Sequence, residues 1–579
     1  MSNVGQLYVV NTRTGAATKV GATPATPTIG GVGFDFNPTV DRLRVVTQTR
    51  QNFRVHPDTG ALVAVDGTLA YAAGDPLSGA IVNVAGAAYT NPVVGATSTT
   101  LYVIDTRGAL APAQLATQGN ATAGPNTGTL FSVGSTNVTT LGNVGFDISR
   151  EGTALATMTS PGTRVTSLYS INLTTGAATL IGALGGNMLY EGLAIALAPF
   201  ATMGTTANQV AVGGQIDQFV GIPRGDTLAL LNGIDNLFAT PGAQSAALSA
   251  LSPAAFSPLT EIALNAAEVS ETTILRYARS VRGGGIMPDG STAMLDSQGR
   301  VGAWIAGGGR EGSFEQAVDR PEFDFHGFHG LGGLDVRIGE ASALGVFGGY
   351  SNSAVRLTPL SQRSGVESWF TGVYGTASLG PVFLDAWGSY TDVKFDLTRS
   401  LSFGGFSAQP TGQTDGEVWA GGASAGLSIA LGAVRFEPFA AIRYAEVKID
   451  GFSEAGGSVA ALNVLRQERE SLRSNVGARL GFGVSDGNVV FRPEIRGGWY
   501  HEFRDDPAII TANFLSNSIG TGSFPFTGTA FDRDYYNAGA SLDVTGGGPF
   551  AVVFDYEAQF DFNGGREIHA ITAGARLAF

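Results

Sequence analysis

A chain of 579 residues is too long for one ordinary hydrophobic core, so we expect two or more domains. Its 83 glycines, together with only 14% charged residues, are typical of a protein rich in turns and strands rather than of a helical enzyme. The absence of cysteine excludes disulfides, thiolate metal sites and cysteine nucleophiles, and the net charge of −14 argues against nucleic acid as a partner.

The first region contains an internal repeat. The segment LYVVNTRTGAATKVGA at 7–22 returns as LYSINLTTGAATLIGA at 168–183, with ten of sixteen residues identical. GFDFNP at 33–38 is echoed by GFDISR at 145–150, and Thr-Gly turns recur at spacings of 45, 68 and 48 residues. Periods of this size are typical of propellers and solenoids.

Each repeat reads as a series of short strands. VGFDFN, RLRVVT, NFRVHP and ALVAVDG follow one another, with Asp58-Thr59-Gly60 as a hairpin turn, which predicts a four-stranded blade. Residue 7 already matches a third strand, while EGLAIAL at 191–197 reads as a first strand with no others after it. We therefore expect a truncated first blade, with the start of the protein and its export signal lying before residue 1.

The phrases FDFNPTVDRLRVV and HPDTGA resemble a bacterial domain family of unknown function that occurs in exported proteins. This resemblance covers about residues 5–198. It implies a β-propeller and supplies no activity.

The composition changes to Ala, Leu, Ser and Gln after Thr205. GDTLALLNGIDNLFA and PGAQSAALSALSP predict short helices, and the segment 257–282 predicts a longer one, with Ser257 and Pro258 in cap and first-turn positions. Gly283-Gly284-Gly285 ends it. The segment is either an ordinary interdomain linker or a helix with a specific place in the region that follows.

From about Val301 to Phe579 the sequence alternates with a period of two. In one strand Val552, Phe554, Tyr556, Ala558, Phe560 and Phe562 take one face, and Asp555, Glu557, Gln559 and Asp561 take the other. A soluble sandwich and an outer-membrane barrel both produce this alternation. We count about twelve strands with alternately tight and long connections, and this alternation of lengths favours the barrel. Aromatic residues near strand ends are consistent with interfacial girdles, namely Trp369, Phe370, Tyr390, Tyr500, Tyr535 and Tyr536.

Residues from about 205 onward resemble the translocator unit of the autotransporter family. The resemblance rests on NQVAV, LLNGIDNL and ALSALSP, on WIAGGG, on GLGGLDVRIGEASALGVFGGYS, and on a terminal Phe. It implies a twelve-stranded outer-membrane barrel, a helix threading its pore and a passenger at the cell surface. The predicted fold is therefore all-β with a helical linker: a propeller-like passenger at 1–200, a linker with the pore helix at 201–285 and a barrel at 286–579.

The helix arginines Arg276, Arg279 and Arg282 are predicted to lie in a lumen that carries Glu494, Asp555 and Glu557; they either pair with these acids or are solvated separately. The resemblance implies that Phe579 is a signal for the outer-membrane assembly machinery, although a plain lipid-facing side chain fits the same alternation. His326 and His329 point to opposite faces in a strand, which argues against a metal site. Asp35 and Asp147 fit a structural role better than paired catalysis. We therefore predict no catalytic, cofactor-binding or metal-binding residues.

Three functions remain open at this point. The first is an autotransporter that displays a propeller for binding or adhesion, with outer-membrane lipid, the assembly machinery and an unknown extracellular ligand as partners and with a monomeric barrel. The second makes the passenger a surface hydrolase or lyase with its active site in the propeller. The third is a soluble two-domain β protein, which would require the apolar rows to be covered.

Overall fold

The computed structural model describes residues 5–10, 15–21, 31–93, 96–185, 188–196, 198–218, 225–281, 285–286, 292–293, 300–339, 342–358, 360, 362–432, 434–456, 458–486, 489–516, 522–546, 549–562 and 565–578. The chain divides into two compact units, Met1–Leu197 and Ala198–Phe579.

The N-terminal unit is built from small antiparallel sheets. The predicted strands form the sheet β3 (Val32–Asn37), β4 (Arg42–Thr47), β5 (Asn52–Val55) and β6 (Leu62–Val65), in that order. A second sheet joins β8 (Val84–Tyr89), β9 (Leu101–Asp105), β10 (Gln114–Gln118), β11 (Thr129–Ser135) and the parallel β7 (Ala70–Tyr71), and a third joins β12 (Val144–Ile148), β13 (Ala154–Thr159), β14 (Thr166–Ile171) and β15 (Ala178–Ala183).

The two copies of the repeated segment form the same structure. The first copy forms the hairpin β1 (Leu7–Val10) and β2 (Ala17–Val20), and the second forms β14 and β15. Strand β8 lies beside both β3 and β12, so the first strands of the three sheets are neighbours. Four-stranded sheets in sequence order are therefore confirmed, while closure of these sheets into a propeller stays a prediction.

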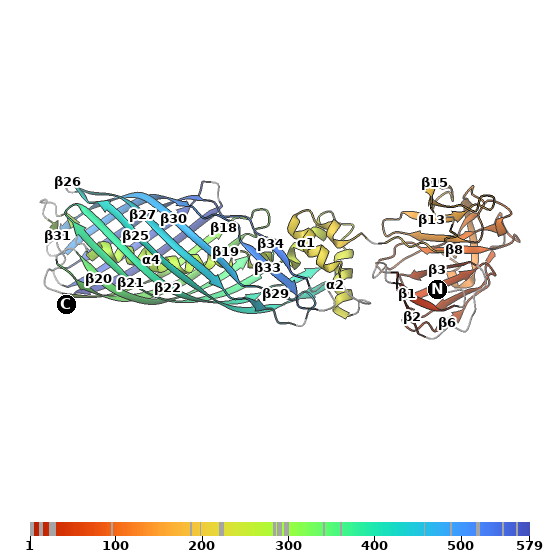
Figure 1. The fold of residues 1–579 in the computed structure, drawn as a ribbon, viewed down its shortest axis with the longest axis horizontal. Helices are drawn as coiled ribbons and strands as arrows, with labels where there is room; N and C mark the ends of the chain where they lie inside the picture. Colours follow the sequence, from red (N-terminus) through yellow and green to blue (C-terminus); the bar gives the residue numbers. More distant parts are fainter. Residues whose placement is uncertain are drawn as a thin grey trace. The chain divides into compact units, whose positions relative to one another are not determined.

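The C-terminal unit is a closed antiparallel barrel of twelve long strands (Figure 1). Closure comes from pairing of the first strand with the last over Gly302–Phe314 and Arg566–Ala578. The strands are β18 (Val301–Phe314), β19 (Phe323–Arg337), β20 (Ala343–Leu357), β21 (Gln362–Leu379), β22 (Val382–Thr398), β25 (Thr411–Leu427), β27 (Val434–Ile449), β30 (Gln467–Phe482), β32 (Val489–Glu502), β35 (Asp534–Thr545), β36 (Phe550–Phe560) and β37 (Arg566–Ala578). Two short segments, β26 (Ile429–Leu431) and β31 (Val484–Asp486), extend the same sheet.

The alternation of side chains is that of a membrane barrel. Apolar residues such as Phe554 and Ile495 are 53% and 61% exposed, whereas Asp555 is 7% exposed. A sandwich would bury its apolar row, but here the apolar row lies outside and the charged row inside. The barrel expectation is therefore confirmed.

Aromatic side chains on the outer wall lie at matching heights on neighbouring strands. Tyr350 lies opposite Trp369 with ring centroids 4.8 Å apart, and Tyr390 lies opposite Trp419 at the same distance. Such a row is typical of an interfacial girdle. Three of the predicted girdle residues do not belong to it. Phe370 and Tyr535 are buried inside the barrel, and Tyr500 also faces inward, where it stacks on Tyr535 and lines a luminal cavity with Arg496. Each of the three follows or precedes an outward residue by one position.

One end of the barrel carries the tight connections and the other carries the long ones. The chain passes directly from β21 to β22 and from β35 to β36 at the short-turn end. At the long-loop end, connections form the hairpin β23 (Leu401–Phe403) and β24 (Phe406–Ala408) and a separate sheet of β28 (Phe452–Ser453), β29 (Leu462–Val464), β33 (Ile509–Phe514) and β34 (Phe524–Thr527).

Four α-helices lie in the described residues before the barrel: α1 (Ala207–Ile216), α2 (Gly225–Asp235), α3 (Ala243–Leu251) and α4 (Leu259–Val281). The short two-stranded sheet of β16 (Gly285–Ile286) and β17 (Thr292–Ala293) follows α4. Over the described part of the chain, a single helix with the length and hydropathy of a membrane span is not found, although the bent pair Ala243–Leu251 and Pro253–Arg279 meets both criteria together.

Candidate functional site

Helix α4 lies inside the barrel and is surrounded by its wall (Figure 1). Its first turns contact residues near the long-loop end of the barrel, and its last turns contact residues toward the short-turn end. The helix therefore enters the lumen at the long-loop end and runs toward the short-turn end, where β18 begins.

The N-terminal half of α4 carries acidic side chains that meet arginines of the wall. Glu261 is fully buried, and its two carboxylate oxygens accept hydrogen bonds of 2.9 Å from Arg469 of β30 and from Arg566 of β37. Arg473 lies 3.6 Å away. A buried carboxylate requires such partners, since an isolated buried charge is strongly unfavourable.

Two further glutamates continue this face of the helix. Glu268 lies 3.4 Å from Arg310 and accepts a hydrogen bond of 2.9 Å from Gln559. Glu271 lies 2.7 Å from Arg443. The three glutamates are separated by seven and three residues, a spacing that places them along one side of a helix.

The predicted luminal residues occupy the other half of the helix interface. Arg276 forms an ion pair with Asp555, and Arg279 lies 3.8 Å from Glu494. Glu557 is not brought to the helix arginines. It accepts a hydrogen bond of 2.8 Å from Arg496 of the wall, which also binds Asp555. Arg282 and Phe579 lie outside the described residues.

The three helix glutamates and their arginines are missing from the sequence-based site. Their spacing was a usable signal, because a buried helix with charges on one side must face opposite charges. The wall arginines that pair with these glutamates could not have been assigned from the sequence, since only closure of the strands into a barrel brings them near the helix.

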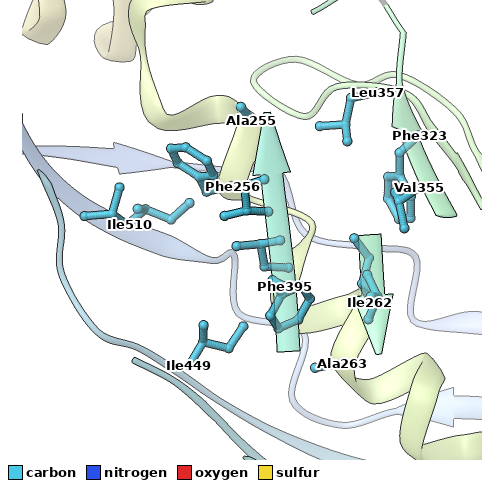
Figure 2. Packing of buried hydrophobic residues seen from close by; sticks show 14 of the residues in the cluster. Ala255, Phe256, Ile262, Ala263, Phe323, Val355, Leu357, Phe395, Ile449 and Ile510 are labelled. Carbon is cyan, nitrogen blue, oxygen red and sulfur yellow. The ribbon is translucent and has the colours of Figure 1, made fainter. Parts of the chain in front are cut away.

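Hydrophobic contacts fix the helix where it enters the lumen. Figure 2 shows Phe256 beside Ile510, with Ile262 near Phe323 and Val355 of the wall. Phe256 also packs edge-on against Phe452, with ring centroids 5.1 Å apart. The entrance of α4 is thus packed like a protein core, whereas its middle is held by charges.

Helices α1 to α3 pack on the long loops at the same end of the barrel, and we call this assembly the cap. Asn208 of α1 is buried and forms two hydrogen bonds with the backbone of Thr527 in β34: its amide donates at 2.8 Å and its carbonyl accepts at 2.9 Å. Beneath α3, the guanidinium of Arg399 donates to Glu454, to the carbonyl of Ala250 and to that of Ala460.

We expect Asn208→Ala to loosen α1 from β34, because both backbone groups of Thr527 lose their partner, and a typical hydrogen bond contributes about 0.5–1.5 kcal/mol. Hydrogen exchange of the full chain in detergent measures this as faster exchange of the amides of α1 and β34. Asn236→Ala is the matched control, since its amide makes one exposed hydrogen bond of 3.3 Å to Gly404. Equal exchange in both variants would contradict the expectation.

The N-terminal unit explains the repeated GFD motif. A methyl group added to Gly33 would lie 2.6 Å from the backbone carbon of Gly86, and one added to Gly145 would lie 2.5 Å from that of Gly192. Only glycine allows the backbone of the neighbouring segment to approach so closely.

The aspartate of each GFD motif binds the backbone of a neighbouring segment, which is strand β8 for Asp35 and the segment 188–196 for Asp147. The prediction of a first strand at 191–197 is wrong for its described residues, since 191–196 form no strand. Asp35 accepts a hydrogen bond of 2.6 Å from the backbone N–H of Tyr89, and Asp147 accepts one of the same length from Ile195. Each also accepts from the next residue of its own strand. Each carboxylate therefore fastens its strand to the segment beside it, which is a structural role.

We expect acidification to stabilise the N-terminal unit. Burial raises the pKa of Asp35 to about 7, with the charge of Asp147 adding to the effect, whereas an unfolded aspartate has a pKa of about 3.9. The folded state then binds more protons between these values, so this contribution to stability falls as the pH rises from 4 to 7. Urea unfolding of the full chain at pH 5 and pH 8 can be monitored by protease cleavage of the N-terminal unit. The urea concentration at the unfolding midpoint should be higher at pH 5. An undiminished difference in Asp35→Asn would contradict this assignment.

The two histidines considered for a metal site point apart. His326 is exposed on the outer wall, and His329 is buried, with its Nε2 3.4 Å from the hydroxyl of Thr572. Across the described ranges of the chain, a group of three or more His, Asp or Glu residues that could hold a metal ion is not found.

Two protein families match this chain. Residues 303–557 match the autotransporter beta-domain, and residues 1–194 match a domain of unknown function, DUF4394. The sequence is 28% identical to Esterase EstA of Pseudomonas aeruginosa over 39% of this chain and 36% of that protein. It is 25% identical to an extracellular serine protease of Serratia marcescens over 43% of this chain and 23% of that protein. The chain thus spans about a third of the length of the first of these relatives and less of the second.

Solved structures are also similar. The translocator domain of the autotransporter NalP from Neisseria meningitidis has a TM-score of 0.41 and 18% identity, over 55% of this chain and 99% of that one. The β-domain of the Bordetella autotransporter BrkA has a TM-score of 0.37 and 17% identity, over 48% and 100%.

The closed barrel, its polar interior and its apolar outer wall agree with the family match. Residues 303–557 therefore form an autotransporter beta-domain, a β-barrel of the outer membrane, and they follow a DUF4394 domain of unknown function at residues 1–194.

Proposed function

We propose that the barrel and α4 translocate the N-terminal domain and display it at the cell surface. The direction of α4 carries this proposal. In outer-membrane barrels the short turns face the periplasm and the long loops face outside. Because α4 begins at the long-loop end, the chain before Leu259 leaves the lumen on the extracellular side.

Cysteine labelling of intact cells tests the display. The chain has no cysteine, so a single introduced thiol is unique. We expect a membrane-impermeant maleimide to label Thr163→Cys, in an exposed turn of the N-terminal unit, and not Ser485→Cys, at the short-turn end, when the chain is made behind an export signal. Both should be labelled after permeabilisation. Labelling of Ser485→Cys alone on intact cells would reverse the orientation and reject the proposal.

The displayed domain is proposed to bind an extracellular ligand or to mediate adhesion. The alternative is a surface hydrolase or lyase, which is favoured by the names of the relatives, an esterase and a serine protease. Washed cells carrying the chain distinguish the two. Hydrolysis of a panel of model esters and peptides, lost in chains that lack the N-terminal unit, would support the enzyme; retention of cells on a surface without hydrolysis would support adhesion.

The remaining partners are proposed from the barrel. The barrel would be monomeric, with its outer wall in contact with membrane lipid. Its last strand would be recognised by the assembly machinery through Phe579. Phe579→Ala should then lower the amount of folded, heat-modifiable barrel in outer membranes, with Leu577→Ala as the control, since Leu577 is exposed on the outer wall. An equal loss in both variants would indicate a plain lipid contact.

A further inference from the structure

The ion pairs between α4 and the wall are sorted by sign along the helix. All three acidic partners on the helix, Glu261, Glu268 and Glu271, belong to its first thirteen residues. Both of its paired arginines, Arg276 and Arg279, follow in the last six. The acidic end lies at the N-terminus and the basic end toward the C-terminus, which also suits the helix dipole.

The charged groups of the barrel wall that meet α4 follow the opposite order along its axis. The groups that pair with the helix glutamates are arginines of four different strands, here called the arginine zone: Arg310, Arg443, Arg469, Arg473 and Arg566. Toward the short-turn end the helix meets carboxylates, here called the acid zone: Glu494 and Asp555, with Glu557 beside them. Arginines also lie in the acid zone: Arg496 binds Asp555 and Glu557, and Arg492 and Arg576 line the cavity beside Arg276.

Because of this order of charges, ion pairing depends on where α4 stands along the barrel axis, and not only on whether it occupies the lumen. Glu271 and Arg276 are five residues apart, so about 7.5 Å along the axis separates the two signs. If the helix stood about 10 Å nearer the periplasm, its glutamates would enter the acid zone. If it stood about 10 Å further out, its arginines would enter the arginine zone. Either displacement replaces attraction by repulsion between buried charges.

We propose that these two zones are the stop that ends outward movement of the chain and fixes the register of α4. The inference rests on the proposed translocation. A chain moving outward carries its glutamates through the acid zone, and it comes to rest where both signs are matched. Further travel would bring Arg276 and Arg279 against the arginine zone. The zones thus recognise the end of the translocated segment by the order of its charges.

A crosslink can report the register, because the chain has no other thiol. Thr273 of α4 and Ala306 of β18 line one small cavity between helix and wall, and neither belongs to the zones. In Thr273→Cys/Ala306→Cys, a short bifunctional maleimide should join helix to wall in isolated outer membranes. The test variant adds E261R, E268R, R276E and R279E, which reverse the order of the charges and leave the net charge of the helix unchanged.

We expect the reversed helix to lower crosslinking at least tenfold while maleimide labelling of the displayed domain continues. Changing the wall as well, by R469E, R473E, E494R and D555R, should restore the crosslink. An undiminished crosslink with the reversed helix would overturn the proposal. Absence of surface labelling in the parent chain would instead reject translocation itself.

A second variant keeps the proposal testable if the helix with reversed charges prevents folding of the barrel. E261Q, E268Q, R276Q and R279Q remove the charges without introducing repulsion, and a heat-modifiable band identifies folded barrels. This neutral helix should give a lower crosslink yield spread over several registers, as read from Cys placed in turn at positions 270 and 272 to 275 of α4. A single register equal to that of the parent would overturn the proposal.

Discussion

Replacement of Glu261 by Gln is expected to destabilise the folded barrel more than any other single change on α4. The carboxylate is fully buried and accepts hydrogen bonds from Arg469 and Arg566 at 2.9 Å, with Arg473 at 3.6 Å. Breaking a buried ion pair by removing one partner typically costs about 3–5 kcal/mol, because the remaining charge stays buried and uncompensated. Glutamine keeps the shape of the side chain, so the loss measures charge rather than packing.

The temperature at which the folded band converts to the unfolded band in detergent gels measures this loss. Glu367→Gln is the matched control, since Glu367 lies on β21 with its side chain exposed on the outer face. We expect a clear lowering for Glu261→Gln and almost none for the control, because exposed charge pairs contribute about 0–1 kcal/mol. Ion conductance through planar bilayers should rise as well, since the plug is less firmly held. A conversion temperature equal to that of the parent would refute the electrostatic anchoring of α4.

Replacement of Arg399 by Met is expected to open the cap. Arg399 and Glu454 are each 2% exposed at the side chain, and they form two hydrogen bonds of 2.7 and 2.5 Å. The single variant leaves Glu454 buried without its cation, which typically costs about 3–5 kcal/mol. Protease cleavage between α3 and α4 and within the loop that carries β28 and β29 should become much faster.

The double variant Arg399→Met/Glu454→Met separates charge from contact. It removes both charges together, so most of the protection should return, although the carbonyls of Ala250 and Ala460 lose a donor. Cleavage as fast in the double variant as in the single one would mean that the cap depends on these carbonyl contacts rather than on burial of an unpaired carboxylate.

The parts of the fold that follow a simple period were predictable from the sequence. Alternation along 552–562 assigned Phe554 to the outside of the barrel and Asp555 to the inside, and the structure confirms both positions. The long helix was predicted at 257–282 and lies at Leu259–Val281. The four short strands after residue 32 were also predicted, because each is bounded by turn residues.

The parts that depend on long-range closure were not predictable. The sheet of β28, β29, β33 and β34 joins strands from two loops, and segments of two to six residues give no clear period. Arg469 and Arg566 are almost a hundred residues apart, and only barrel closure brings both to Glu261. Phe370 was misplaced because it adjoins Trp369, and a one-residue error moves a side chain to the opposite face of a strand.

Protease treatment of intact cells tests the central claim most directly. If the barrel displays the N-terminal unit and encloses α4, a broad protease should remove residues 1–197 and leave a fragment that begins in the cap or at the entrance of α4 and extends to the end of the chain. Mass spectrometry of the membrane-bound fragment locates its first residue. The account predicts that cleavage stops before Leu259. Cleavage within α4 in folded barrels, or complete resistance of the N-terminal unit until the cells are lysed, would contradict it.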